Sequence, residues 1–264
     1  MAMKDKYSLL IDELVQVVVS TFQENKQSIT TNLKEKHDYV TNVDLAIERV
    51  VIELINSRYP SHQVIGEESV PEFIDFSQPT WLIDPLDGTS NFVFDIPFYG
   101  FSIAFILDNQ VQAALIIDLA SHEVFTAFRG GGAYLNSKRL YIKDNQSDFI
   151  GISSGFVEQA AIQAPDVLLD IRKQGKFRLL GAQALHLCYV AAGRLKACIN
   201  YEAKVWDDIA GALIVEEAGG RYSSKASFNT CRISSIKSDQ NLMSIAEGGG
   251  TSLIAQLASR IALH

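Results

Sequence analysis

The second half of this sequence alternates between short apolar runs and segments of helical periodicity, and this alternation limits the fold more than any other feature. Three strand-like runs alternate with three helical segments, at about 149–153, 160–173, 177–180, 183–192, 197–201 and 206–217. Strands joined through helices are typical of sheets that are covered by helical layers. We therefore predict an α/β protein in which helices and sheets are stacked.

The first half predicts two helices followed by antiparallel strands. Apolar residues recur at helical spacing at about 7–24 and from Asp44 to Tyr59, with a polar, irregular segment at 37–44 between them. Pro85 lacks an N–H and is expected to end a strand. Strands are predicted at 64–65, 81–83, 100–107, 111–118, 122–128 and 242–246, and a last helix at 251–263. The three glycines at 130–132 lack a phosphate-loop pattern and predict a turn.

Length and composition exclude several classes of protein. A chain of 264 residues can form one domain or two small ones, and we predict a single domain over residues 1–264. The net charge of -8 argues against a nucleic-acid-binding surface, which needs clustered Lys and Arg.

The cysteines and the hydropathy of the sequence indicate the cellular compartment in which we expect the protein. Cys188, Cys198 and Cys231 have neither the even number of a disulfide framework nor the spacing of a zinc site. Acids interrupt the apolar positions near the N-terminus, and no run approaches the roughly 18 apolar residues of a membrane span. We expect a cytoplasmic protein that does not insert into a membrane.

The segment from Ile83 to Phe92 combines two acids, a turn and a series of backbone donors. Asp84 and Asp87 are three residues apart, so both can face one hard cation, with the Leu86 carbonyl as a third oxygen ligand. The N–H groups of the following residues, 88–91, can hold a phosphate because glycine allows close approach. The alternative is an ordinary turn, since turns favour Asp, Pro and Gly.

Two further acids, Glu67 and Asp207, occur at a predicted strand end and a predicted helix start. If they converge with Asp84 and Asp87, the four carboxylates repel one another unless a cation is bound, and magnesium is the first candidate. Spacing alone does not show this convergence. Helix capping is the simpler interpretation of Asp207 and also of Asp44, for which the residues favour capping over catalysis.

Three motifs together resemble the inositol monophosphatase family: VIGEES, WLIDPLDGTSNF and VWDDIAGALIVEEAGG. The resemblance runs from about Asp38 to the end of the VEEAGG segment, and also includes GGGAYLN and GAQALHLCYVAAGRL. It implies a layered αβαβα sandwich of the inositol monophosphatase and fructose-1,6-bisphosphatase type. It also implies a homodimer that hydrolyses small phosphomonoesters with magnesium and is inhibited by lithium.

The resemblance assigns roles to individual residues. The implied ligands of two or three Mg²⁺ ions are Glu67, Asp84, the Leu86 carbonyl, Asp87 and Asp207. The implied catalytic residues are Asp44, Thr89 and Glu67, of which Asp44 and Thr89 activate the attacking water together with a metal, without a covalent enzyme intermediate. The implied substrate-binding residues are Asp87, Gly88, Thr89, Ser90, Gly181, Gln183, Glu202 and Asp207.

Two departures from the family pattern affect substrate recognition. Glu202 matches the glutamate that binds a substrate hydroxyl, but the segment up to Trp206 is shorter than in the animal pattern. Gln183 stands where the family often has a small residue, so its side chain is expected to crowd the alcohol or to form a hydrogen bond with it. Inositol monophosphate is the first substrate prediction, while NADP(H), fructose-1,6-bisphosphate and 3′-phosphoadenosine 5′-phosphate stay open.

Two other classes of function compete with this prediction. A haloacid-dehalogenase-type phosphatase attacks phosphate with an aspartate, but its two aspartates are separated by one residue, whereas Asp84 and Asp87 are separated by two. A non-catalytic binding module of the same fold predicts damage among the acids, and all of them are present.

Overall fold

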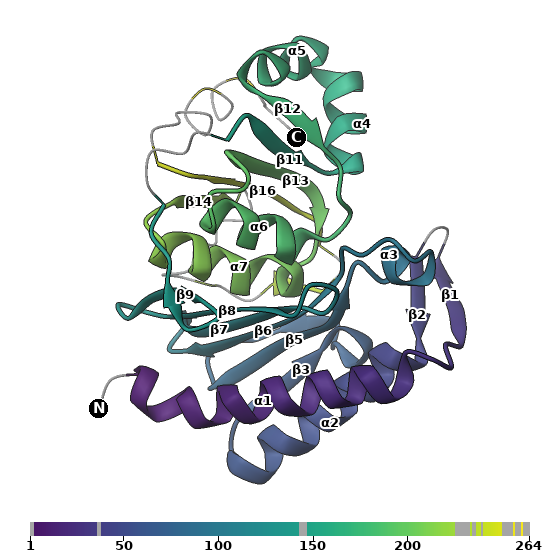
Figure 1. The fold of residues 1–264 in the computed structure, drawn as a ribbon, viewed down its shortest axis with the longest axis vertical. Helices are drawn as coiled ribbons and strands as arrows, with labels where there is room; N and C mark the ends of the chain where they lie inside the picture. The colour runs from purple at the N-terminus through teal and green to yellow at the C-terminus, as the bar shows by residue number, and fades with distance from the viewer. Residues whose placement is uncertain are drawn as a thin grey trace.

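The computed structural model describes residues 3–35, 38–142, 147–224, 233, 236–238, 240–249, 256 and 260. Five layers are stacked in Figure 1, with helices at both outer faces and in the middle. The outer helices are α1 (Met3–Asn25) with α2 (Asn42–Arg58) and α4 (Ser154–Gln163) with α5 (Pro165–Gln174), and the middle layer is α6 (Gln183–Ala191) with α7 (Val205–Glu217). The predicted αβαβα sandwich is therefore confirmed.

The larger sheet has seven strands in the order β10-β9-β8-β7-β6-β5-β3. These are β3 (Gln63–Gly66), β5 (Thr80–Asp87), β6 (Gly100–Leu107), β7 (Gln110–Asp118), β8 (Glu123–Phe128), β9 (Gly132–Leu135) and β10 (Lys138–Arg139). The predicted antiparallel series at 100–128 is confirmed. The three glycines form the predicted turn, in which Gly130 and Gly132 have φ of 69° and 89°, a conformation that glycine adopts without strain.

The smaller sheet has five strands in the order β12-β11-β13-β16-β14. These are β11 (Phe149–Ile152), β12 (Lys176–Arg178), β13 (Ala197–Ala203), β14 (Arg221–Ser224) and β16 (Leu242–Glu247). Because β11 pairs in parallel with β12 and β13, the predicted alternation of strands and helices is confirmed. The predicted helix at 251–263 lies almost entirely outside the described residues.

Two predicted elements differ from the structure. The single helix predicted at 160–173 is two helices, because Pro165 disfavours a helical conformation at Ala164, which has φ of -151°. The segment 37–44, predicted to be irregular, includes β2 (Asp38–Thr41), which forms a hairpin with β1 (Thr31–Glu35) before α2 begins.

Short elements that the sequence did not predict complete the fold. A 3₁₀ turn, η1 (Glu67–Ser69), follows β3, and α3 (Thr89–Val93) follows β5. Strand β4 (Phe73–Ile74) pairs with β15 (Ile236–Lys237). None of the helices in the described part of the chain has the length and apolar character needed to cross a membrane.

Pro85 does not end its strand, contrary to the prediction. Strand β5 continues to Asp87, and its pairing with β6 shifts by one residue around Pro85. Asp84 lies opposite Ser102, whereas Asp87, three residues later, lies opposite Gly100. This is a β-bulge, and a bulge is one of the few places in a sheet that accept a proline.

The bulge determines where the two acids point. In a regular strand, side chains three residues apart face opposite sides of the sheet. Ser102 and Gly100 are two residues apart and share a face, so their partners Asp84 and Asp87 share it too. The Ser102 hydroxyl donates to the Trp206 carbonyl of α7 at 3.3 Å, which identifies this face as the one that the middle helices cover.

The two middle helices are packed without space between them at Gly211 of α7. A Cβ atom added at Gly211 would lie 2.5 Å from both the Cβ and the Cδ1 of Leu187 in α6, and the second of these atoms is absent from alanine. Both helices are apolar on most sides and form the core between the two sheets.

Gly211→Ala is expected to lower the free energy of unfolding by about 1–3 kcal/mol, because the new methyl group overpacks the contact between α6 and α7. An uncrowded helical site would instead gain about 1 kcal/mol from the same change. Denaturant unfolding of both proteins measures whether Gly211→Ala lowers or raises the free energy of unfolding. Leu187→Ala should cost less in the Gly211→Ala background than in the wild type, and a stabilised Gly211→Ala protein would contradict the packing.

Candidate active site

The acids of the bulged strand are buried and already hydrogen-bonded to backbone. Asp84 is 2% exposed, and its Oδ1 accepts the Leu86 N–H at 2.9 Å within the bulge. Asp87 is 9% exposed, and its Oδ2 accepts the Ala184 N–H at 2.6 Å. The Gln183 backbone N–H also bonds to Asp87. Asp87 therefore connects the seven-stranded sheet to the first turn of α6.

Asp207 and Asp44 begin two different helices, and both do cap them. Asp207 is the third residue of α7, and its Oδ2 accepts the Lys204 N–H at 2.8 Å. Asp44 is the third residue of α2, and its Oδ2 accepts the Thr41 N–H at 2.9 Å. Each of these caps uses one carboxylate oxygen, so capping does not exclude a second role for the other oxygen.

The second oxygen of Asp44 faces Thr89. Asp44 Oδ1 is 3.0 Å from the Thr89 hydroxyl, which is also 2.8 Å from the Leu86 carbonyl. The hydroxyl has one hydrogen and therefore donates fully to only one of these oxygens at a time. Thr89 follows Gly88, whose φ of 86° is left-handed, and a Cβ atom there would lie 3.0 Å from the Phe98 carbonyl oxygen.

Two adjoining cavities collect the residues that the sequence singled out. The first, of about 200 Å³, is lined by Glu67, Asp84, Leu86, Asp87, Gly88, Thr89, Ser90, Gly181 and Asp207. The second, of about 270 Å³, shares Asp87, Gly181 and Asp207 with the first and adds Gln183 and Glu202. Asp44 lines neither and reaches the first cavity through Thr89.

The carboxylates around the first cavity disfavour one another's charge. Burial, followed by the nearby charges of Glu67, Asp207 and Asp87, raises the pKa of Asp84 well above its usual value. Burial likewise raises the pKa of Asp87 to about 7. For Asp207, burial and then Asp87 and Glu67 raise the pKa.

This donor set has the chemistry that a divalent cation prefers. Carboxylate and carbonyl oxygens are the ligands of Mg²⁺ and Ca²⁺, and a bound cation would offset the repulsion among the acids. Among the described residues, however, no three His, Cys, Asp or Glu side chains stand close enough to share one ion as they are. Binding would therefore draw the carboxylates together.

Glu67 is held by contacts that the sequence did not predict. Lys34 Nζ of β1 is 3.0 Å from Glu67 Oε1 and also pairs with Glu68. The buried carboxylate of Glu48 accepts the Glu68 N–H at 2.9 Å. A Cβ atom on Gly66 would lie 2.1 Å from this Glu48 carboxylate, so a larger residue there would displace the carboxylate from its bond with Glu68. Neither Lys34 nor Glu48 belongs to a motif that the sequence made visible.

Gln183 lines the second cavity, and its side chain already has protein partners. Its side chain is 6% exposed, and both ends of its carboxamide bond to protein groups: Nε2 to Asp208 at 2.7 Å and Oε1 to Asn200 at 3.1 Å. Each end of the amide thus has a protein partner, and the contact with the alcohol that the resemblance implies stays a prediction. Glu202 stays at the cavity, and its Oε2 accepts the Gly155 N–H at 2.9 Å.

Asn91 is a site residue that sequence reasoning did not single out by its side chain. Its Nδ2 donates to the carbonyls of Phe98 and Leu180, each at 2.7 Å, and it lines the second cavity. The bond to Leu180 ties α3 to the segment before α6. The only sequence signal for Asn91 was its place in the TSNF motif, and there the backbone N–H groups, not the side chain, were predicted to bind phosphate.

Comparisons with known proteins show the family of this chain. The model of the inositol monophosphatase family matches residues 4–227. A relative in Pasteurella multocida, Nus factor SuhB, is 40% identical over 209 residues, which cover 77% of this chain and 78% of the relative.

Solved structures share the fold. The structure of SaIMPase-II bound to inositol monophosphate is 26% identical, with a TM-score of 0.77, and the alignment covers 94% of this chain and 91% of that one. An IMPase/NADP phosphatase complexed with Mg²⁺ and phosphate has a TM-score of 0.83 over 98% of this chain and 96% of that one. At 21% identity, this second likeness shows the fold alone.

Without a divalent metal, stability should fall as pH rises from about 4 to about 7. The folded protein holds a proton on Asp87, with its pKa of about 7, that the unfolded chain releases near the usual carboxyl value of 3.8. Thermal unfolding in a chelator should therefore give a lower Tm at neutral pH. Asp87→Asn should flatten this dependence, whereas the exposed Asp95→Asn should keep it. Equal slopes of Tm against pH in the wild type, Asp87→Asn and Asp95→Asn would contradict the prediction.

Proposed function

The chain belongs to the inositol monophosphatase family, and from this we propose that it is a magnesium-dependent phosphatase that hydrolyses a small phosphomonoester, with inositol monophosphate as the first candidate. One observation carries the proposal. Asp84, Asp87 and Asp207 line one cavity, and the bonded pair of Thr89 and Asp44 lies at its edge. A chain that kept only the fold would have no reason to maintain this buried, mutually repelling group of acids.

The residues that would hold two or three Mg²⁺ ions are Glu67, Asp84, Asp87, Asp207 and the carbonyl of Leu86. When bound, the ions would supply polarisation of the phosphoryl oxygens, acidification of the attacking water and stabilisation of the leaving oxygen. Glu67 would exchange all or part of its ion pair with Lys34 for a metal contact. The backbone amides of Gly88, Thr89 and Ser90 would face the phosphate oxygens.

Thr89 and Asp44 would move the proton of the attacking water. When the Thr89 hydroxyl donates to Asp44 Oδ1, its oxygen is left to accept a hydrogen bond from a water in the cavity. The water passes its proton to Thr89 as Thr89 passes its own to Asp44. Burial raises the pKa of Asp44, which favours this transfer. The water oxygen then bonds to phosphorus as the bond from phosphorus to the alcohol oxygen breaks, and the departing alkoxide takes a proton from solvent. No covalent enzyme intermediate forms.

The second cavity would receive the alcohol. It adjoins the acids through Asp87, Gly181 and Asp207, and Glu202 and Ser153 bring polar groups to it. A polyol such as inositol offers hydroxyl groups to these side chains. The likeness to a structure bound to inositol monophosphate also supports this substrate class. NADP(H), fructose-1,6-bisphosphate and 3′-phosphoadenosine 5′-phosphate remain alternatives for the same chemistry.

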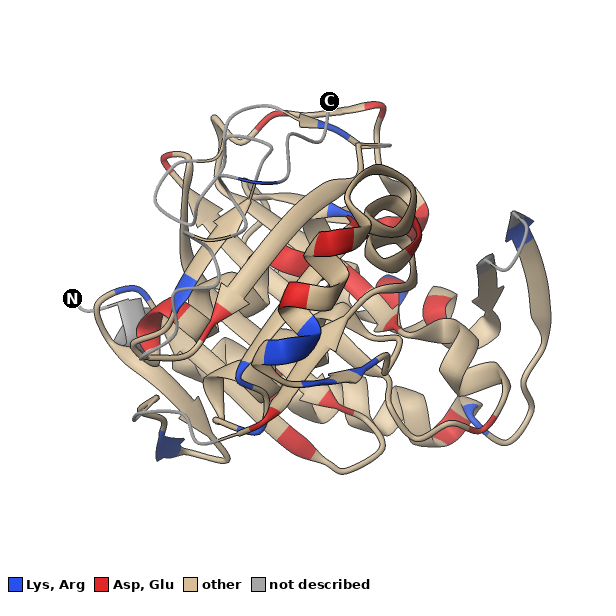
Figure 2. Ribbon diagram, turned by 90° about the horizontal axis from the view of Figure 1, so that it is seen from above, with Lys and Arg blue, Asp and Glu red and all other residues tan. Residues whose placement is uncertain are grey.

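A second candidate function comes from the relative named Nus factor SuhB. We propose a binding role of that kind only beside catalysis, because the acids of the site are all present. We expect no nucleic-acid surface on the protein itself: Figure 2 shows acidic segments interspersed with basic ones, and acidic residues outnumber basic ones by 31 to 23. From the family we also propose that the protein is cytoplasmic, that it forms a homodimer and that lithium inhibits it.

The substrate proposal predicts magnesium-dependent phosphate release from inositol monophosphate within a panel of phosphomonoesters. In heavy-oxygen water, a single turnover should place the label directly in phosphate, because the attacking oxygen comes from water. A phosphorylated enzyme trapped by acid quench during turnover would instead indicate a covalent aspartyl phosphate. Failure to release phosphate from any member of the panel with magnesium would overturn the proposed function and leave the binding role.

Asp87→Asn and Asp207→Asn should each remove most turnover, because each takes one charge from a group of acids that holds metal as a unit. The double variant should be little worse than either single one. Helix capping alone predicts a different result, since Asn caps a helix about as well as Asp. Values of kcat across a magnesium titration distinguish the metal-ligand role from helix capping alone. The exposed Asp95→Asn is the control. A near-normal kcat in Asp207→Asn would contradict its role as a metal ligand.

A further inference from the structure

A group of buried polar side chains extends from the wall of the second cavity into the core, and the mechanism does not use it. Its members have 0–7% of their surface exposed and come from two helices and three strands: Gln183, Asn200, Asp208, Tyr222 and Ser244. Buried polar groups are costly unless they are hydrogen-bonded, and these are bonded to one another. Such a group needs an explanation beyond filling the core.

Asp208 is the centre of this polar network. It is fully buried in α7, next to Asp207 in the chain. Its Oδ1 accepts the Gln183 Nε2 at 2.7 Å, and its Oδ2 accepts the Tyr222 hydroxyl at 3.1 Å. The Ser244 hydroxyl also bonds to it. Asp208 therefore fixes the orientation of the Gln183 carboxamide.

The network continues from Gln183 to the strand that carries Glu202. Gln183 Oε1 accepts the Asn200 Nδ2 at 3.1 Å. Asn200 Oδ1 in turn accepts the N–H groups of Glu202 and Ala203, both at 2.7 Å. With its amide turned this way, Asn200 has both ends of its side chain bonded.

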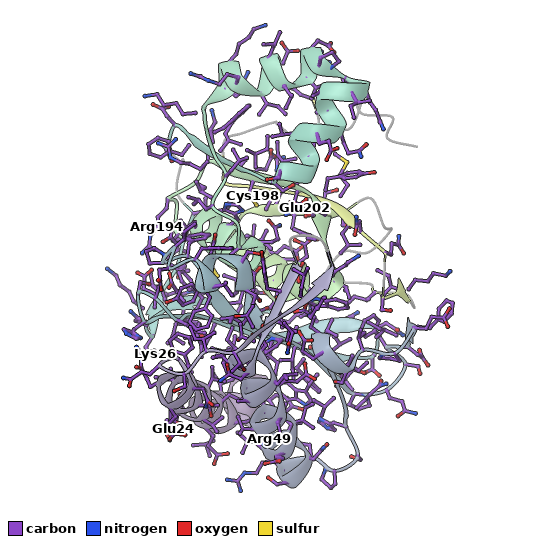
Figure 3. All side chains as sticks on the ribbon, turned by 90° about the vertical axis from the view of Figure 1, so that its right-hand side faces the viewer. Glu24, Lys26, Arg49, Arg194, Cys198 and Glu202 are labelled. Carbon is purple, nitrogen blue, oxygen red and sulfur yellow. The ribbon has the colours of Figure 1, made fainter. Side chains whose placement is uncertain are left out.

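These last bonds stabilise a second β-bulge. In β13, Asn200 lies opposite Ser244, whereas Ala203, three residues later, lies opposite Leu242. One extra residue is therefore accommodated between them, and Glu202 belongs to this segment. Figure 3 shows Glu202 on the same strand as the buried Cys198. The backbone of the bulge, and with it the direction of Glu202, depends on Asn200.

We propose that Gln183, Asp208 and Asn200 act as positioning residues that set Glu202 against the alcohol part of the substrate. The inference rests on the proposed phosphatase function. The same Gln183 also donates its backbone N–H to Asp87, so one residue connects the acid cavity to the alcohol cavity. Specificity for a polyol would then depend on a side chain that does not itself touch the substrate.

Gln183→Met tests the proposal, because Met keeps the length of the side chain but cannot hold the Asn200 amide. The KM for inositol monophosphate should rise about five- to tenfold, as expected for losing one aligned hydrogen bond to the substrate. The KM for ethyl phosphate, which has no hydroxyl for Glu202, should stay within about twofold of the wild type, and so should the magnesium concentration for half-maximal rate.

Variants of Asp208 and Tyr222 separate positioning from loss of stability. Asp208→Leu should repeat the effect of Gln183→Met, whereas Asp208→Asn should largely restore the wild-type KM because its amide oxygen can still accept from Gln183. Tyr222→Phe also removes a bond to Asp208, but it lies off the route to Asn200. It should lower Tm and leave the KM for inositol monophosphate unchanged.

The outcomes distinguish this inference from the function on which it rests. If the wild type hydrolyses inositol monophosphate but Gln183→Met has the same KM, or raises the KM for both substrates equally, the positioning role is wrong and the phosphatase stands. If KM follows Tm across all four variants, the network is only structural. If the wild type hydrolyses neither substrate and calorimetry shows no binding of inositol monophosphate, both proposals fail.

Discussion

The β-bulge at Pro85 is the constraint on which the rest of the site depends. One extra residue in β5 turns Asp84 and Asp87 to the same face, toward the middle helices. Burial raises the pKa of both carboxyl groups, and nearby negative charges, among them Glu67 for both and Asp87 for Asp84, raise it further. Neighbouring groups offset this rise only in part, through backbone N–H donors from Leu86 and Ala184. The arrangement is understandable if a divalent cation completes it.

The five layers bring the remaining groups to these two acids. Helices α6 and α7 lie between the sheets, and their first turns contribute Gln183, Ala184 and Asp207 at the bulged strand (Figure 1). Asp44 and Asp207 show how one side chain serves two purposes. One oxygen of each caps a helix, which fixes the carboxylate in place, and in Asp44 the other oxygen meets Thr89. Stability and chemistry therefore use the same residues.

The sequence predicted the layers and the acids better than their connections. Periodicity located most helices and strands, and the family resemblance selected acids that the fold does collect around one cavity. The prediction that Pro85 ends its strand was wrong because tertiary pairing overrides a local rule. Strand β5 tolerates Pro85 because a bulge leaves its position out of the regular hydrogen-bond ladder. Nothing in a single sequence indicates that Asp208 and Asn200 bond to the amide of Gln183. Lys34 and Glu48 were missed because each reaches the site from a distant segment.

The central claim is that the bulge makes Asp84 and Asp87 parts of one metal site. Crystals soaked with Mn²⁺, a divalent ion that takes the same oxygen ligands as Mg²⁺ and scatters anomalously, would test it most directly. The account predicts anomalous peaks in the cavity lined by Asp84, Asp87 and Asp207, with an ion bonded to both Asp84 and Asp87 and to the Leu86 carbonyl. Peaks found only outside this cavity, or the absence of any ion that contacts both aspartates, would contradict the account.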